Sequence, residues 1–120
     1  MAELKLGTVE ARFADIVWEN EPISTSELVR KCAETLNWKR TTTYTVLKRL
    51  CERGIFVTDS GIVTSLISRA DFYSAQSEKF VEETFAGSLP AFIAAFTAHK
   101  SLSKEEVESI IKMIDNYEEE

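Results

Sequence analysis

The stretch from Trp38 to Gly54 limits the possible folds most strongly, because its side chains separate into two chemically different faces at helical spacing. The face expected to pack on a core contains Thr43, Val46, Leu47 and Leu50, and the opposite face contains Thr41, Tyr44, Thr45, Lys48 and Glu52. Gly54 comes next, and a glycine commonly follows the end of a helix. We therefore predict an amphipathic helix with one apolar side and one polar side.

The polar side of this predicted helix has the chemistry of a surface that reads DNA. Four cations flank it, namely Lys39, Arg40, Arg49 and Arg53. Cations bind backbone phosphates, whereas hydroxyls and longer polar side chains reach base edges in the major groove. The alternative interpretation is a surface helix whose basic side is only hydrated. This stretch alone does not separate the two.

The charge of the chain is unevenly distributed along the sequence. The formal net charge is −6, which by itself opposes binding to nucleic acid. Residues 1–69 carry ten Lys or Arg and nine Asp or Glu, whereas residues 70–120 carry four and eleven. Phosphate binding depends on the local surface more than on the total charge. The basic residues are therefore concentrated in the half that contains the predicted DNA-reading helix.

The segments before this helix predict two further helices. The first is expected from Thr8, as its N-cap, to Asn20. Its apolar stripe contains Val9, Phe13, Ile16 and Val17. The Ser24 and Glu27 pair has the spacing of a capping box and predicts a second helix that ends near Leu36. Two helices joined by a tight turn, with a basic face on the second, are typical of a helix-turn-helix.

The segment after the central helix predicts a β-hairpin. Residues 55–59 and 62–67 are rich in β-branched and aromatic side chains, and the Ser60-Gly61 pair between them is a turn signal. Three helices followed by a hairpin are the order of elements in a winged helix. We therefore predict a mostly α fold with a small β-hairpin, in which residues 1–68 form a winged helix-turn-helix DNA-binding domain.

Residues 69–120 are expected to form a three-helix dimerisation segment. The pattern contains five phenylalanines on short helices, more than such helices bury easily by themselves. A homodimer is the symmetric way to cover them, and the alternative is that these helices fold back on the N-terminal half. The residues predicted to form the dimer interface are Phe72, Phe80, Phe85, Leu89, Phe92, Ile93, Phe96, Val107, Ile110, Ile111 and Ile114.

Several classes of function are disfavoured by the composition. Cys32 and Cys51 are too few for a disulfide framework and too isolated for a metal site, so we interpret both as packing residues, with a redox pair as the alternative. His99 is the only histidine, and no paired carboxylates, activated nucleophile or glycine-rich phosphate loop are recognisable. We therefore expect no enzyme, no metal and no cofactor. Without an apolar run or a signal pattern, a cytoplasmic protein without membrane insertion is expected.

The order of motifs resembles the penicillinase, methicillin-resistance and copper-homeostasis repressors of bacteria (the BlaI/MecI/CopY family). The resemblance covers nearly the whole chain. It is carried by Leu6, Glu10, Ile16-Val17-Trp18, the Trp38–Gly54 run with Thr42 and Arg49-Leu50, Ser68-Arg69-Ala70-Asp71-Phe72, Gly87-Ser88-Leu89, the 92–96 stretch and Leu102-Ser103-x-Glu105-Glu106.

This resemblance implies a dimeric winged-helix repressor that binds an inverted-repeat operator of double-stranded DNA. It places DNA contacts on Thr41, Thr42, Tyr44, Thr45 and Arg49, and the face derived from periodicity adds Lys48, with Lys39 and Arg40 at its edge. Occlusion of a promoter in a resistance or stress-response operon is the expected mechanism. The alternative function is a winged-helix module that binds protein and lacks sequence-specific DNA binding.

Three features differ from the family pattern. The predicted hairpin tip, residues 59–61, lacks the basic residues of some members, so we expect no strong phosphate contact there. The C-x-C pairs of the copper-responsive members are missing. In the β-lactam-responsive members a membrane sensor protease cuts an Asn-Phe bond, and the matching bond here is Ala95-Phe96. That bond is the candidate proteolytic switch, and we expect it to resist an Asn-Phe-specific sensor.

Overall fold

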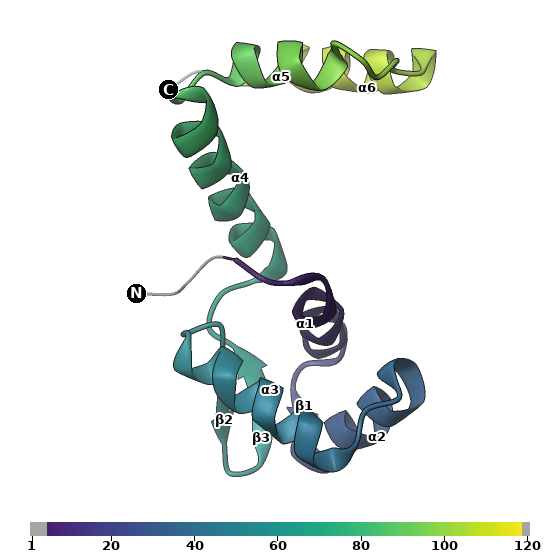
Figure 1. Cartoon of the computed structure of the whole chain (residues 1–120), viewed down its shortest axis with the longest axis vertical. Helices are drawn as coiled ribbons and strands as arrows, with labels where there is room; N and C mark the ends of the chain where they lie inside the picture. The colour runs from purple at the N-terminus through teal and green to yellow at the C-terminus, as the bar shows by residue number, and fades with distance from the viewer. Residues whose placement is uncertain (1–4, 119–120) are drawn as a thin grey trace. The chain divides into compact units, whose positions relative to one another are not determined.

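The structure is a computed structural model that describes residues 5–118 of the chain (Figure 1). The described elements are α1 (Thr8–Asn20), β1 (Ile23–Ser24), α2 (Thr25–Leu36), α3 (Arg40–Glu52), β2 (Phe56–Asp59), β3 (Ile62–Ser65), α4 (Arg69–Phe85), α5 (Leu89–Thr97) and α6 (Lys104–Asp115). The chain divides into an N-terminal unit, Met1–Glu78, and a C-terminal unit, Lys79–Glu120. Glu119 and Glu120 lie outside the described residues, as do residues 1–4.

The first helix has the predicted bounds but a different cap. Gly7, not Thr8, is the N-cap of α1, and the Glu10 carboxylate accepts a hydrogen bond from the Gly7 N–H at 3.1 Å. Val9 is also not part of the buried stripe, because its side chain is 54% exposed in the first turn. Ala14 is buried in its place, so the inward face of α1 begins one turn later than the periodicity predicted.

The helix-turn-helix forms from local signals. Ser24 caps α2 by accepting a hydrogen bond from the Glu27 N–H at 3.2 Å. The second hydrogen bond of the predicted capping box, from the Ser24 N–H to the Glu27 carboxylate, does not form. The Glu27 carboxylate accepts a hydrogen bond from Arg30 Nε at 3.1 Å instead. Asn37 ends α2 in the left-handed conformation, with φ 57°, which asparagine tolerates better than most residues. This turn leads directly into α3.

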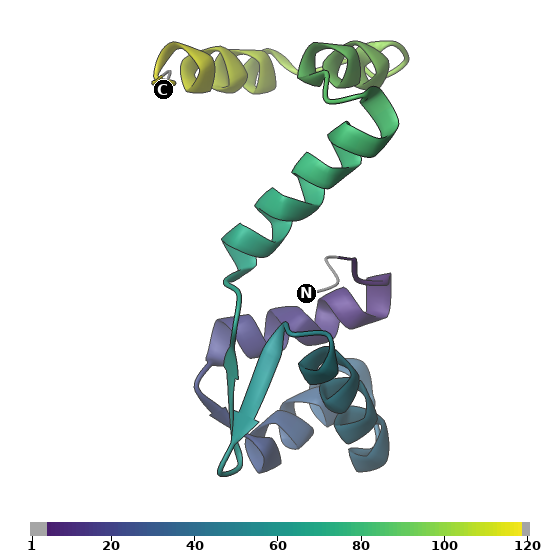
Figure 2. The same ribbon diagram turned by 90° about the vertical axis from the view of Figure 1, so that its left-hand side faces the viewer.

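A three-stranded antiparallel sheet completes the winged helix, with the strand order β1, β3, β2. Figure 2 shows the β2–β3 hairpin beside the three helices of the N-terminal unit. Its turn contains Ser60 and Gly61, which both have positive φ as a tight hairpin turn requires. The sequence did not predict β1, whose Ile23 pairs with Val63. Two residues next to a proline are too short to produce a strand pattern.

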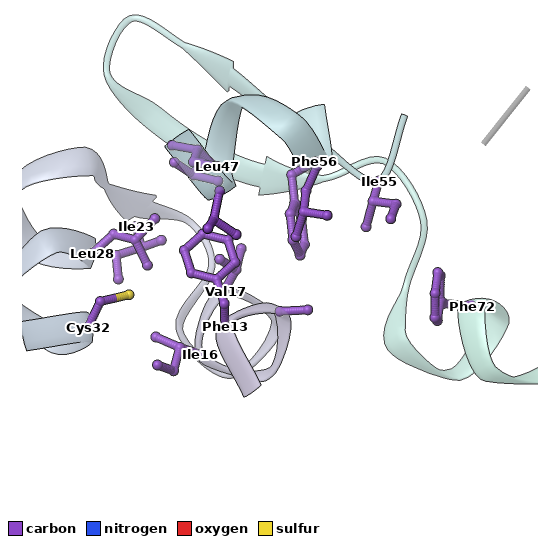
Figure 3. Close-up of a cluster of buried hydrophobic side chains, with 14 residues drawn as sticks. Phe13, Ile16, Val17, Ile23, Leu28, Cys32, Leu47, Ile55, Phe56 and Phe72 are labelled. Atoms are coloured by element: carbon purple, nitrogen blue, oxygen red, sulfur yellow. The ribbon is translucent and has the colours of Figure 1, made fainter. Parts of the chain in front are cut away.

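The core of the N-terminal unit is apolar and continuous. Figure 3 shows side chains from α1, α2, α3 and the sheet around it. The buried hydrophobic residues are Phe13, Ala14, Ile16, Val17, Ile23, Leu28, Cys32, Val46, Leu47, Leu50, Ile55, Phe56, Val63 and Phe72. The rings of Phe13 and Trp38 are stacked with centroids 5.7 Å apart. The predicted inward face of α3 is confirmed, since all four of its residues are buried.

The position of Phe72 shows that one part of the predicted dimer interface is wrong. Its side chain is fully buried in the core of the N-terminal unit, with its ring centroid 5.6 Å from that of Trp18. The Trp18 indole N–H donates to the carbonyl oxygen of Ile67 at 3.1 Å, which fixes the chain just before α4. A ring enclosed in this way offers no surface to a second chain. The start of α4 therefore belongs to the winged-helix core.

The C-terminal unit is built from well-capped helices that enclose little. Ser88 caps α5, and Ser103 and Glu106 form a capping box at the start of α6. The rings of Phe80, Phe85 and Phe92 pack edge to face, with centroids 5.6–6.0 Å apart. Nevertheless, no residue of α5 or α6 is buried among the described residues. Within residues 5–118, no helix is both long enough and apolar enough to cross a membrane.

Candidate nucleic-acid interface

The polar face of α3 is exposed over its whole length. The side chains of Thr41, Thr42, Thr45, Lys48 and Arg49 are all exposed, whereas Thr43, Val46, Leu47 and Leu50 are buried. This division arises because the apolar residues fix the rotation of α3 about its own axis. The predicted DNA-contacting residues of α3 are consequently presented together on one surface.

The threonine hydroxyls of α3 use only part of their hydrogen-bonding capacity within the helix. Thr45 Oγ1 donates to the Thr41 carbonyl oxygen at 2.8 Å, one turn earlier in the helix. The hydroxyl proton is therefore used inside the helix, but the oxygen lone pairs still face outward and can accept from a base amino group. In this conformation the exposed Thr45 hydroxyl can act outward only as a hydrogen-bond acceptor, which the sequence alone did not indicate.

Tyr44 is held in place by a neighbouring cation. The Arg40 guanidinium carbon lies 5.6 Å from the centroid of the Tyr44 ring, within the range of a cation–π contact. Tyr44 is 37% exposed, so part of its side chain remains accessible. Lys39 and Arg40 are both exposed at the N-terminal end of α3. The first turn of α3 therefore presents two positive charges and an oriented phenol.

The C-terminal end of α3 carries an ion-pair cluster that we call the Glu10 clamp, consisting of Glu10, Arg49 and Arg53. Arg49 Nη1 is 3.3 Å from Glu10 Oε2, and Arg53 Nη1 is 3.4 Å from Glu10 Oε1. The pKa of Glu10 is lowered by the hydrogen bond from the Gly7 N–H, and further by Arg49 and Arg53. Sequence reasoning treated Arg53 as a flanking phosphate ligand. The structure encloses its side chain, which is only 15% exposed.

A shallow groove of about 440 Å³ lies on the surface where α3 packs beside the sheet. Tyr44 and Lys48 line it on the helix side, and Val57 and Thr58 line it on the strand side. Residues 55–67 contain no Lys or Arg, so the hairpin offers hydroxyls and main-chain groups rather than cations. Positive charge at this surface therefore comes from α3.

The two cysteines are free thiols. Burial raises the pKa of the Cys32 thiol, which keeps it protonated and unreactive. Cys51 is half-buried, with its sulfur 3.7 Å from the Thr58 hydroxyl oxygen. Among the described residues there is no group of three or more His, Cys, Asp or Glu side chains placed to hold a metal ion.

The residues predicted to form the dimer interface gather at a second surface, on the C-terminal unit. An apolar groove of about 270 Å³ is lined by Phe92, Ile93, Phe96, Thr97, Leu102, Val107, Ile110 and Ile111. Phe80 and Phe85 pack against Phe92. Leu89 and Ile114 are not part of the lining and are 57% and 67% exposed. Phe72 belongs to the N-terminal unit, where it is buried in the core.

The predicted proteolytic switch lies inside α5. Ala95 and Phe96 belong to its last turns, and the Ala95 carbonyl oxygen accepts from the Ala98 N–H at 3.4 Å. Phe96 is 48% exposed, and Lys100 Nζ lies 5.7 Å from the centroid of its ring. A protease must bind its substrate in extended form, so cleavage here requires α5 to unwind locally.

The sequence of this chain is similar to those of known proteins. A family model described as the penicillinase repressor matches residues 6–116. The chain is 21% identical to the penicillinase repressor of Bacillus licheniformis over 117 residues, which cover 94% of this chain and 91% of that protein. It is also 21% identical to the methicillin resistance regulatory protein MecI of Staphylococcus aureus over 115 residues, covering 92% and 94%.

Proposed function

Since this chain belongs to the penicillinase repressor family, which consists of transcriptional repressors and not of enzymes, we propose that it represses by binding an inverted-repeat operator as a homodimer. The exposed polar face of α3 is the single observation that carries this proposal. That face combines hydroxyls, a phenol and cations on a helix whose other side is fixed to a core. A helix of this kind can enter the major groove without unfolding any part of the domain.

The contacts divide between two roles. Thr41, Thr42, Tyr44 and Thr45 are the residues that we assign to base edges, since hydroxyls carry directional hydrogen-bonding capacity. Lys39, Arg40, Lys48 and Arg49 are the residues that we assign to phosphates, since cations attract phosphates of any duplex and their contacts hold the helix in position on the DNA.

The dimer is supported by the apolar surface of the C-terminal unit. Phe96, Val107 and Ile111 are 48%, 39% and 51% exposed, and they surround the same groove. Apolar side chains gathered this densely on one surface are typical of a protein interface. A two-fold dimer uses the same surface from both copies, and it gives the pair of recognition helices that an inverted repeat requires.

Repression then results from occupation of the operator by the dimer. A dimer on an operator that overlaps a promoter excludes RNA polymerase from the same DNA. The regulated genes that we propose are a resistance or stress-response operon, by extension from the penicillinase and methicillin resistance named for the relatives.

Release requires loss of the dimer, because one half-site alone binds weakly. In the family pattern, the partner for this step is a membrane sensor protease. Cleavage of the Ala95-Phe96 bond would remove α6 from the unit and open the apolar groove. We expect an Asn-Phe-specific protease to leave this bond intact, since Ala95 has no polar side chain for it to recognise.

Selection from a random pool tests the main proposal. The full-length protein is incubated with random duplexes at moderate salt, and the bound DNA is recovered, amplified and sequenced over several rounds. We expect a two-fold repeat whose half-sites are one DNA turn, or a multiple of it, apart. Duplexes recovered without any common sequence, together with a flat salt dependence, would favour the protein-binding alternative.

Co-expression tests the proposal on release. The wild type and Ala95→Asn are each produced with an induced sensor protease of a β-lactam-responsive relative, and the fragments are identified by mass spectrometry. We expect the wild type to remain intact and Ala95→Asn to be cut at least partly. Efficient cutting of the wild type between residues 95 and 96 would contradict the expectation.

A further inference from the structure

The Glu10 clamp links the start of the chain to the end of the recognition helix. Glu10 lies on α1, whereas Arg49 and Arg53 lie on the last turn of α3 and directly after it, about forty residues later in the sequence. Arg53 also donates to the carbonyl oxygen of Lys5. One carboxylate therefore orders two guanidiniums and the segment that enters α1.

The two arginines of the clamp differ in what they can reach. The Arg53 side chain is 15% exposed, so it is enclosed between α1 and α3. The Arg49 side chain is 54% exposed, and its guanidinium stays on the surface that we assign to DNA. Glu10 itself is 19% exposed at the side chain. Within the Glu10 clamp, Arg53 and Glu10 are therefore largely enclosed, and Arg49 is the exposed member.

We propose that Glu10 is a positioning residue of the DNA interface, which orders the Arg49 guanidinium and screens part of its charge before DNA arrives. This inference rests on the proposed function, in which Arg49 contacts phosphate. A side chain that is already ordered loses less conformational freedom when it binds. A charge that is already shared attracts phosphates less strongly at a distance.

The ordering of Arg49 and the screening of its charge have different consequences for operator DNA and for random duplex. Random duplex is bound mainly through charge, so screening of Arg49 weakens binding to it. Binding to the operator also depends on correctly placed contacts. The ordering of Arg49 therefore offsets, on the operator, the affinity that is lost through screening of its charge. Glu10 therefore increases the ratio of operator binding to random binding. It achieves this without touching DNA itself.

Neutralising Glu10 tests the proposal. Glu10→Gln keeps the shape of the side chain and an acceptor for the Gly7 N–H, but it removes the charge. Binding to the selected operator and to a scrambled duplex is measured by fluorescence anisotropy from about 50 to 300 mM salt. We expect the plot of log K against log salt on scrambled DNA to become steeper by up to about 0.9, the value for one phosphate contact. The operator-to-scrambled ratio should fall several-fold.

Glu19→Gln is the matched control, because Glu19 is an exposed carboxylate on the same helix. It changes the net charge equally without involving Arg49. The second control is the pair of substitutions in an Arg49→Ala background, where Glu10→Gln should have no more effect than Glu19→Gln. Equal slopes for Glu10→Gln and Glu19→Gln in the wild-type background would overturn the proposal.

A comparison that leaves Glu10 in place guards against misfolding of the variant. Lys48 and Arg49 are both exposed cations of α3, but an ion pair within residues 5–118 is recorded only for Arg49. Lys48→Ala should flatten the salt slope by about 0.9, and Arg49→Ala by clearly less, because its charge is shared. A larger effect for Arg49→Ala would overturn the role of Glu10 while leaving the proposed function standing. Absence of any DNA binding by the wild type would overturn both.

Discussion

The two units of this chain use their apolar residues in opposite ways. In the N-terminal unit, Phe13, Phe56 and Phe72 have no exposed surface. In the C-terminal unit, Phe80 and Phe96 are 50% and 48% exposed, although their rings pack in the same edge-to-face and tilted manner. The difference does not come from composition, since both units are rich in aromatic side chains.

The difference comes from the number of layers. The N-terminal unit covers its core with three helices and a sheet, so each apolar face meets another one. The helices of the C-terminal unit, in contrast, leave an apolar groove open. The N-terminal unit therefore has a closed core, whereas the described part of the C-terminal unit leaves its apolar side chains partly uncovered. The following predictions test this contrast.

The largest expected effect comes from a charge in the open groove. Ile111 is 51% exposed in the isolated unit, so Ile111→Glu should leave the single chain folded. Burying an unpaired carboxylate in a dimer costs several kcal/mol, so the variant should be monomeric where the wild type is dimeric at micromolar concentration. Affinity for a two-half-site operator should fall by about 10²–10⁴. Sedimentation and anisotropy measure the two quantities.

Ser101→Glu serves as its control, since Ser101 is exposed in the loop between α5 and α6 and does not line the groove. It should remain dimeric. A wild type that sediments as a monomer would remove the basis for assigning these residues to dimerisation.

Substitutions of Phe72 and Phe96 test the two units separately. Phe72→Ala leaves a cavity in a closed core and should reduce the free energy of unfolding of the N-terminal unit by about 3–5 kcal/mol. Phe96→Ala should weaken the dimer and change that free energy by less than about 1 kcal/mol. Both tryptophans, Trp18 and Trp38, lie in the N-terminal unit, so their fluorescence during urea unfolding reports on this unit alone. Equal losses for both variants would contradict the division.

The polar face of α3, which we propose to contact DNA, is also exposed, because the opposite face of this helix packs on the core. Tyr44→Phe or Thr45→Ala should cost about 1–3 kcal/mol on the operator and little on random duplex, because hydrogen bonds to base edges are lost. Lys48→Ala should weaken binding to both duplexes. Equal losses on both duplexes for all three variants would show that the base-reading residues are wrongly assigned.

The smallest expected effect concerns acid stability. The pKa of Glu10 is lowered by the Gly7 N–H, Arg49 and Arg53, so its charged form stabilises the folded state. That contribution is present above the ordinary carboxylate range, near pH 4.5, and is lost as the pH falls through the lowered value. The melting temperature of Glu10→Gln should therefore approach that of the wild type between about pH 5 and pH 3. A constant difference across this range would exclude the linkage.

Much of the fold could be predicted from local patterns. The bounds of α1 and α2, the two faces of α3 and the Ser60-Gly61 turn follow from periodicity and turn chemistry, because each involves residues close together in the sequence. The four buried residues of α3 were predicted because one side of a helix must face the core.

The features that could not be predicted depend on contacts between distant segments. β1 exists because Ile23 reaches Val63, and a two-residue segment has no pattern of its own. Phe72 resembles the other phenylalanines of its half of the sequence, and only its contact with Trp18 places it in the first core. Glu10 could be read as a first-turn acid, but its partners on α3 become visible only when α1 and α3 are packed.

The separation of the two faces of α3 has a consequence for how such a regulator can change over evolutionary time. The buried face contributes to the core, whereas the exposed side chains of Thr41, Thr42 and Thr45 contribute little to it. Exposed substitutions of this kind usually alter stability by no more than about 0.5 kcal/mol. Mutation can therefore explore new target sequences along a nearly neutral path, and a gene duplicate can acquire a different regulon while its scaffold stays the same.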